Sequence, residues 1–235
     1  MTATEILTEL KKMGDAQTKK TLMKHGAREP FFGVKVADLK NILKKTRKNH
    51  ELSLELYATG NSDAMYLACL MADETKISEA KLEEWVDQAY WYYLSEFAVP
   101  WVAAESPFGF KLGLKWIESG HEHIASAGWA TLAYLATINP DDKLDIRIYD
   151  QLLDRVEKQI HQSQNRVRYA MNGFVIAVGS SVCDLTEKSR GVAGKIGKVT
   201  VDMNGTACKV PLATETIGKI AGKGQIGKKR KSARY

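Results

Sequence analysis

The residues of this chain best suited to chemistry lie in one stretch, 88–101. Its fourteen positions hold six aromatic side chains and one carboxylate, Glu96. At helical spacing, Tyr92, Glu96, Val99 and Ala103 share one face. Two interpretations are open: an exposed helical glutamate beside half-buried rings, or a carboxylate at the floor of an aromatic cleft that stabilises positive charge.

Other chemistries find little support in the pattern. The five histidines include one close pair, His121 and His123, and two residues apart on a helix these side chains face different directions. There is no P-loop, no G-x-S-x-G motif and no convincing cysteine–histidine pair. We therefore expect no bound metal and no cofactor.

The composition is that of a protein that folds without covalent staples. A chain of 235 residues, 44% of them hydrophobic, can bury a substantial core. The scattered cysteines, Cys69, Cys183 and Cys208, indicate a reduced environment. No apolar run approaches the roughly 20 residues of a membrane span, and the N-terminus lacks signal-peptide features. We expect a cytoplasmic monomer, associated with the bacterial nucleoid or otherwise intracellular, with no membrane contact.

Charge is distributed unevenly along the chain. Residues 1–50 hold 12 Lys/Arg against 5 Asp/Glu, residues 187–235 hold 12 against 3, and residues 51–186 hold 10 against 20. The net charges are therefore +7, +9 and −10, which together give the +6 of the whole chain. Two basic ends on an acidic middle suggest a polyanion bound at two places. A solvated charge pattern without a partner is the alternative.

Helical periodicity dominates residues 1–197. Apolar residues recur at spacings of three and four in segments of roughly 10–17 residues, including one helix expected over 93–104. Short connections, such as 119–120 and 139–142, imply antiparallel neighbours. Helix pairs recur about every 35–40 residues. We predict an all-α fold, a HEAT-like α-solenoid of antiparallel helix pairs, with a compact helical bundle as the alternative.

One segment, 198–211, breaks the helical pattern. It alternates apolar and polar residues around Asn204 and Gly205, a pair that favours a tight type I′ turn. We therefore predict a β-hairpin insertion near the C-terminus. A lone hairpin is marginal in water, so it is either a structural insertion packed on the helices or a probe into a nucleic-acid groove, with Lys198 and Lys209 at its flanks.

The chain ends in a basic segment. After a final short helix expected over 212–219, residues 220–235 hold five basic residues among the last eight, and no Asp or Glu follows Glu215. The glycines of this segment disfavour a helix, so we predict a flexible tail. Such arms bind phosphates and release counterions; a solvated tail is the alternative. The predicted units are a repeat domain over 1–197, the 198–211 hairpin, the short helix and the tail.

Four groups of residues carry a resemblance to a known family. They are Phe32-Gly33-Val34 with Leu39-Lys40, Trp91-Tyr92-Tyr93-Leu94-Ser95-Glu96 with Val99-Pro100, Lys115-Trp116-Ile117, and Arg168 with Met171-Asn172-Gly173-Phe174. Over about residues 20–195, they resemble the HEAT-like-repeat DNA alkylation-repair family, the AlkD-type DNA glycosylases. The second group is the most specific, because the family pattern there reads Trp-Trp-Asp-x-x-Asp.

This resemblance implies roles for individual residues. In active members the final Asp of the pattern stabilises the sugar cation that forms as an alkylated base departs, and tryptophans flank the lesion. That Asp corresponds to Glu96, the second Trp to Tyr92 and a later Trp to Phe174. The arginine of a family Trp-x-x-Arg motif has no counterpart, since the segment 124–127 stands in its place. The other expected cleft aromatics are Trp91, Tyr93 and Trp129.

These departures from the family pattern indicate that the cleft is retained while the catalytic residues are not. The change to Glu96 moves the carboxylate by one methylene, and a misplacement of about 1 Å can cost on the order of 10²-fold in rate. Losing an indole weakens cation stabilisation, because Trp is the best cation–π partner. The chain most resembles the hairpin-bearing, non-glycosylase AlkF/AlkG-type branch. That resemblance implies recognition of branched or distorted DNA by its shape.

We therefore predict a DNA-binding protein without efficient base excision. One alternative is an alkylpurine DNA glycosylase that uses Glu96, and another is a protein-binding HEAT-repeat scaffold. The residues expected to contact DNA are Lys35, Lys44, Lys45, Arg166, Arg168, Lys198, Lys209, Lys228, Lys229, Arg230 and Lys231.

Overall fold

The computed structural model describes residues 1–234, and helices are the regular secondary structure in this range. The α-helices are α1 (Ala3–Met13), α2 (Ala16–Lys24), α3 (Val36–Thr46), α4 (His50–Ala58), α5 (Ser62–Met71), α6 (Glu79–Gln88), α7 (Val99–Glu105), α8 (Gly109–Trp116), α9 (Glu122–Ile138), α10 (Ile146–Gln159), α11 (Asn165–Ser181), α12 (Thr186–Ile196) and α13 (Ala213–Gly222). A π-helix, η1 (Tyr93–Ala98), precedes α7, and 3-10 turns are η2 (Asp141–Lys143), η3 (Ile160–Gln162) and η4 (Cys183–Leu185).

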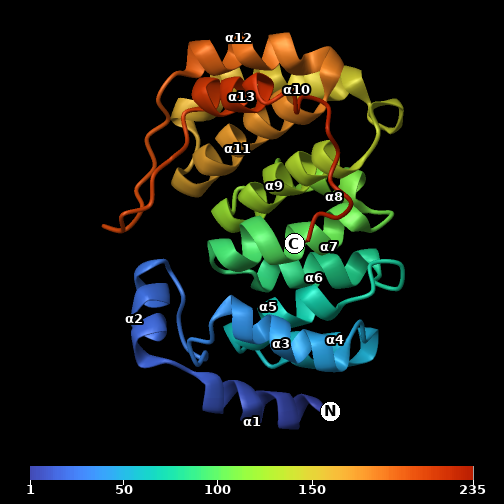
Figure 1. Cartoon of the computed structure of the whole chain (residues 1–235), viewed down its shortest axis with the longest axis vertical. Helices are drawn as coiled ribbons and strands as arrows, with labels where there is room; N and C mark the ends of the chain where they lie inside the picture. The colour runs from blue at the N-terminus through green and yellow to red at the C-terminus, as the bar shows by residue number, and fades with distance from the viewer. Residues whose placement is uncertain (235) are drawn as a thin grey trace.

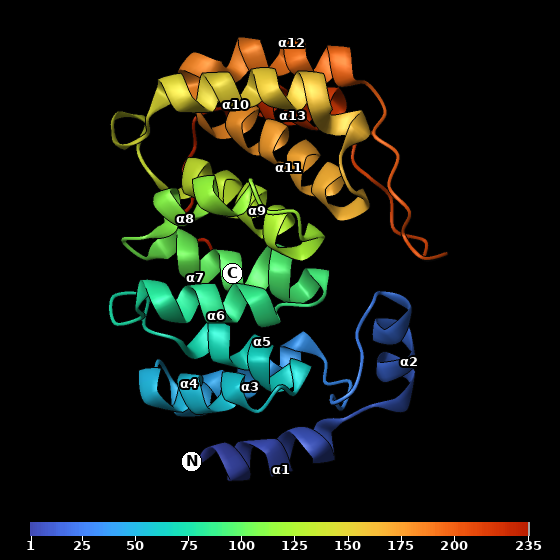
Figure 2. The same ribbon diagram turned by 180° about the vertical axis from the view of Figure 1, so that it is seen from behind.

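The helices stack in two layers (Figure 1). Helices α4, α6, α8, α10 and α12 form an outer layer that faces the viewer in Figure 2. Behind them lies an inner layer of α5, η1 with α7, α9 and α11, in which α9 and α11 share the most extensive contact. We call the exposed side of this layer the inner face. The predicted all-helical architecture is confirmed in this part of the chain. No long apolar helix capable of crossing a membrane occurs within residues 1–234.

Side-chain caps determine where several helices begin. At α1, the amide of Glu5 donates to the Thr2 hydroxyl at 3.3 Å, and the amide of Thr2 donates to the Glu5 carboxylate at 2.9 Å. At α5, the Asn61 side chain accepts from the amides of Asp63 and Ala64. Such caps satisfy amides that have no partner within the helix. The local sequence therefore fixes these boundaries.

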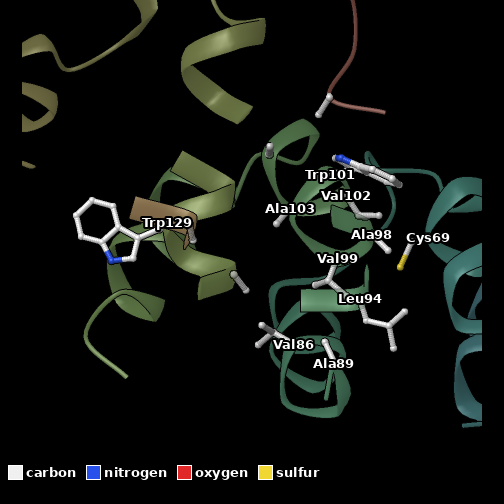
Figure 3. Close-up of a cluster of buried hydrophobic side chains, with 14 of the residues drawn as sticks. Cys69, Val86, Ala89, Leu94, Ala98, Val99, Trp101, Val102, Ala103 and Trp129 are labelled. Atoms are coloured by element: carbon white, nitrogen blue, oxygen red, sulfur yellow. The ribbon is translucent and has the colours of Figure 1, made fainter. Parts of the chain in front are cut away.

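The core between the layers is rich in indoles. Trp85, Trp101, Trp116 and Trp129 are all fully buried, and Figure 3 shows two of them among the small apolar side chains of the inner layer. Where α8 meets α9, a Cβ at Gly128 would lie 2.6 Å from the amide nitrogen of residue 117. Only glycine permits this approach, so α8 and α9 pack closely at this point.

The linker between α2 and α3 is held by one buried carboxylate. Asp63 accepts from the amides of Phe32, Gly33 and Val34 at 2.6, 3.1 and 3.1 Å. Burial raises the pKa of Asp63, and the three amide donors oppose that rise. Gly33 has a φ of +80°, and a Cβ there would meet Lys19 at 2.6 Å. This anchor fixes α2, which projects from the stack (Figure 1).

The predicted β-hairpin over 198–211 is wrong, because no strand forms in the described part of the chain. The turn at its centre does exist. Asn204 and Gly205 have φ values of 53° and 68°, and the amide of Thr206 donates to the carbonyl of Met203 at 3.1 Å. Beyond this turn the two arms form an irregular loop, which extends toward α2 (Figures 1 and 2).

Side chains of α11 take the hydrogen bonds that a β-ladder would need. The Asn165 side chain accepts from the amide of Asp202 at 2.7 Å and donates to the Asp202 carbonyl at 2.9 Å. The Asn172 amide group donates to the carbonyl of Pro211 at 2.9 Å. Backbone groups paired in this way are not available for cross-strand pairing. The loop is therefore tethered to the inner layer rather than closed on itself.

The tail predicted as flexible over 220–235 lies across the stack in the structure, and its last residue is outside the described range. Helix α13 extends to Gly222, and residues 223–234 form what we call the C-terminal strap. The amide of Gly227 donates to Ser180 at the end of α11, and the amide of Arg230 donates to Thr137 near the end of α9. The strap continues to the end of α7, where Figure 1 shows it crossing the inner layer.

Candidate nucleic-acid interface

Glu96 lies in an irregular part of the inner layer. The π-helix η1 precedes α7, so the single regular helix expected over 93–104 does not form. Pro100 has no amide hydrogen and cannot bond to the Glu96 carbonyl four residues earlier. The Tyr134 hydroxyl donates to that carbonyl instead, at 3.3 Å. π-Helical turns are frequent at functional sites, and this one turns the Glu96 side chain inward, where the residue is 4% exposed.

The Glu96 carboxylate is paired with an arginine of α11. Arg166 Nε donates to Glu96 Oε1 at 2.7 Å, and Arg166 Nη2 donates to Glu96 Oε2 at 2.6 Å. The backbone amide of Arg166 also donates to the Glu122 carboxylate at 2.9 Å. This two-pronged geometry is the strongest form of arginine–carboxylate pairing. Both oxygens of Glu96 therefore already face a cation of the protein itself.

Aromatic rings enclose the arginine of this pair. The guanidinium carbon of Arg166 lies 4.6 Å from the ring centre of Tyr92 and 4.5 Å from that of Tyr169. Its Nη1 lies 3.6 Å from the sulfur of Met203, which belongs to the 198–211 loop. Cation–π contacts strengthen when water is excluded. We call Glu96, Arg166, Tyr92 and Tyr169 the pair cluster.

Electrostatics at the pair cluster do not favour a free anion. Burial raises the pKa of Glu96 to about 7; the hydrogen bonds and charge of Arg166 oppose this rise, and Glu122 adds to it. Burial, assisted by Arg166, lowers the pKa of the nearby His25. The carboxylate is thus less ionised near neutral pH than an ordinary glutamate, and its charged form faces Arg166.

Two cavities adjoin the pair cluster. The first, of about 140 Å³, lies where the end of α2 meets the 198–211 loop. Its lining includes His25, Tyr92, Arg166 and Met203. The second, of about 200 Å³, lies on the inner face between η1, α9 and α11, and its lining is mostly apolar. The inner face is therefore hollowed on both sides of Glu96, without exposing the carboxylate broadly.

The structure places three of the expected cleft aromatics in the core. Phe174 and Trp129 are buried in the core, where their ring centres are 5.1 Å apart in an edge-to-face arrangement. Trp91 is also buried, with its indole nitrogen donating to the Ser62 hydroxyl at 2.8 Å and its ring stacked on half-buried Tyr93. Aromatic residues at helical spacing filled the core in these places. Of the expected aromatics, Tyr92 lies closest to the role assigned to it, beside the pair of Glu96 with Arg166.

The residues expected to contact DNA fall into two groups. Some are engaged within the protein: Arg166 binds Glu96, half-buried Arg168 donates to Asn165 at 3.4 Å, Lys45 approaches Glu9 at 3.7 Å, and Lys229 pairs with Asp141 at 2.7 Å. The other side chains, those of Lys35, Lys44, Lys198, Lys209, Lys228, Arg230 and Lys231, are exposed, and Lys45 is exposed as well despite its contact with Glu9.

The sequence did not predict the residues that Glu96, Arg166 and Arg234 contact in the folded protein. Tyr169 lies three residues after Arg166, a spacing that puts both on one helix face and could have indicated their contact. The pairing of Arg166 with Glu96 spans 70 positions, and no local pattern signals it. Arg234 is buried at the end of the strap, where it donates to the carbonyl of Ala72 at 2.8 Å. Nothing in the local sequence indicates that an arginine one residue from the end of the chain is buried.

Sequence comparisons relate this chain to a described family and to two bacterial proteins. Residues 6–188 match the model of a family described as DNA alkylation repair enzyme. The uncharacterised proteins Lin0241 of Listeria innocua and Lmo0209 of Listeria monocytogenes are each 33% identical to the chain over 225 residues, which is 93% of this chain and 97% of theirs.

A solved structure resembles the whole chain. Its TM-score is 0.90 at 38% sequence identity, and the match covers 98% of each chain. That protein is described as belonging to a new family related to the HEAT-like repeat DNA glycosylases, with affinity for branched DNA structures.

Proposed function

The chain belongs to the DNA alkylation repair enzyme family, and we propose that it binds branched or distorted DNA without efficiently excising alkylated bases. Support for DNA as the partner comes from the similar solved structure, whose protein is described as having affinity for branched DNA structures. The all-helical stack with a hollowed inner face offers a surface for such a partner. The protein would act inside the cell, where DNA is.

The observation that carries the non-catalytic part of the proposal is the bidentate pairing of Glu96. Stabilising a sugar cation requires a carboxylate whose charge is directed at the reacting centre. Here both oxygens of Glu96 accept hydrogen bonds from Arg166, and the residue is 4% exposed. The guanidinium is thus the cation that this carboxylate stabilises. The sugar cation left by a departing base would find no free negative charge at this position.

The binding part of the proposal draws on charge and shape. Lys198 and Lys209 are exposed on the 198–211 loop, and Lys228, Arg230 and Lys231 contribute further positive charge along the strap. Cations at these sites contact phosphates of any sequence. The loop and strap lie at different ends of the inner helices, so a bent or branched backbone reaches both more readily than a straight one. Shape, rather than base edges, would then determine preference.

A binding experiment with matched DNA tests this proposal. Fluorescence anisotropy is measured with a four-way junction, a bulged duplex and a linear duplex of equal length and composition, between about 50 and 200 mM salt. We expect the junction to bind about tenfold more tightly than the linear duplex, and all affinities to fall steeply with salt. Equal affinity for junction and duplex would refute the preference for branched DNA. Affinity that does not respond to salt would refute phosphate binding altogether.

A further inference from the structure

A groove separate from the two cavities at the pair cluster lies away from that cluster. It has a volume of about 960 Å³ and lies between α3 and the C-terminal strap, over the ends of α5, α7 and α9. We call it the strap groove. Two carboxylates, Glu74 and Glu105, and six cationic side chains line it. The cationic residues are Lys40, Lys44, Arg47, Lys48, Lys231 and Arg234.

The wall formed by the strap is built from buried interactions. Glu105, at the end of α7, accepts hydrogen bonds from the Ser232 hydroxyl and from the amide of Ala233, the latter at 2.8 Å. Its other oxygen lies 3.1 Å from Nε of Arg234, whose side chain is 9% exposed. A strap held at so many points has a defined position, so the groove exists before any ligand arrives.

The two carboxylates of the groove are already neutralised by cations. Glu74 binds the Lys48 ammonium at 2.7 Å through both oxygens and also receives Arg234 Nη2 at 3.1 Å. Glu105 is paired with Arg234. By contrast, Lys44 and Arg47 on the α3 side have no ion pair with any described residue. The strap groove therefore holds positive charge in excess of its acids.

The strap also affects the electrostatic potential of the groove, because its cations bind the carbonyl groups at the helix ends beneath it. Carbonyl groups at the ends of α5 and α9 carry partial negative charge that would repel an anion. Arg234 donates to the Ala72 carbonyl at 2.8 Å, and Lys229 donates to the Ala136 carbonyl at 2.8 Å. These cations cover the carbonyl ends. The exposed cations of α3, together with Lys231, then make the electrostatic potential of the groove positive.

We propose that the strap groove binds the sugar-phosphate backbone of a second arm of branched DNA, through Lys44, Arg47 and Lys231. The inference rests on the proposed function and adds a second contact, separate from the pair cluster and the 198–211 loop. A groove of this size suits a strand of backbone, and unpaired cations gain affinity by releasing its counterions. Two separate backbone contacts give a branched molecule an advantage that a single straight duplex lacks.

Charge reversal tests the proposal in the full-length protein. The variant Lys44→Glu/Arg47→Glu is compared with Arg147→Glu/Lys158→Glu, which makes the same charge change on exposed residues of α10 in the outer layer. Kd is measured for a four-way junction and a linear duplex of equal length across a salt series. For two lost phosphate contacts we expect junction affinity to fall about 10- to 100-fold and the salt slope to decrease by about 2.

The other arms of the experiment separate the possible outcomes. Duplex affinity is expected to change by less than about threefold in the α3 variant, and the α10 control is expected to bind both probes nearly as the wild type does. Circular dichroism confirms that both variants are folded. Unchanged junction affinity in the α3 variant, or an equal loss in the α10 control, would refute this inference and leave the proposed function intact. Failure of the wild-type protein to bind any DNA would refute both.

Discussion

Removing the arginine of the pair cluster should reveal how far Glu96 depends on it. In Arg166→Met an apolar chain of similar length replaces the guanidinium. Glu96 then loses two charge-assisted hydrogen bonds of 2.7 and 2.6 Å while remaining 4% exposed. Breaking a buried pair by removing one partner typically costs about 3–5 kcal/mol.

The structure places the expected cost near the lower end of that range. The Arg166 side chain is 18% exposed, so some water can reach the vacated site. Burial already raises the pKa of Glu96 to about 7, so the orphaned carboxyl can take up a proton instead of remaining charged. We therefore expect the free energy of unfolding to fall by about 3 kcal/mol.

Urea denaturation at pH 7 measures this cost, with Arg168→Met as the matched control two positions along α11. Arg168 makes only a 3.4 Å contact with Asn165, so its replacement should cost about 1 kcal/mol or less. The double variant Glu96→Met/Arg166→Met should cost about 1–3 kcal/mol less than the sum of the two single changes. A cost below about 1 kcal/mol for Arg166→Met, typical of exposed pairs, would refute the claim that Glu96 is committed to Arg166.

Three further changes test the remaining elements. Burial raises the pKa of folded Glu96 to about 7, so between about pH 4.5 and 7 the folded protein binds more protons than the unfolded chain, and the free energy of unfolding should fall as pH rises through this window. Glu96→Gln should flatten this pH dependence, as measured by urea denaturation at several pH values. An unchanged slope of unfolding free energy against pH would contradict the raised pKa. Glu105→Gln should weaken the contacts of Glu105 with Ala233 and Arg234 that anchor the strap. Trypsin should then cleave after Lys231 severalfold faster than in the wild type, whereas an unchanged cleavage rate would show that the anchor is dispensable. Asn165→Ala should cost about 1 kcal/mol and increase amide exchange at Asp202, and unaltered protection there would rule out the tether.

The helical architecture could be predicted because each helix carries its own signals. Periodic apolar residues and caps such as Thr2 and Asn61 act within a few positions, and these local signals do not depend on the rest of the fold. The same reasoning correctly identified a turn at Asn204 and Gly205. It failed for the flanking strands, because the tethering side chain of Asn165 lies 37 positions away.

The candidate site was predictable only in outline. Resemblance located Glu96, but its partner Arg166 lies 70 positions away, and the sequence alone indicated a phosphate contact instead. Phe174 and Trp129 match cleft positions by type, yet helical spacing serves a core equally well, and the core is where both lie. The basic residues of the strap suggested a mobile arm, whereas buried Arg234 covers a helix end. In each case the position of the side chain depends on contacts with residues far away in the sequence.

The most direct test of the central claim is base release from DNA alkylated with a methylating agent, with protein in excess over lesions. Because Arg166 occupies both oxygens of Glu96, we expect release of methylated purines at the background rate of depurination, unchanged in Glu96→Gln. Release well above background that disappears in Glu96→Gln would show that this carboxylate is catalytic and would contradict the account.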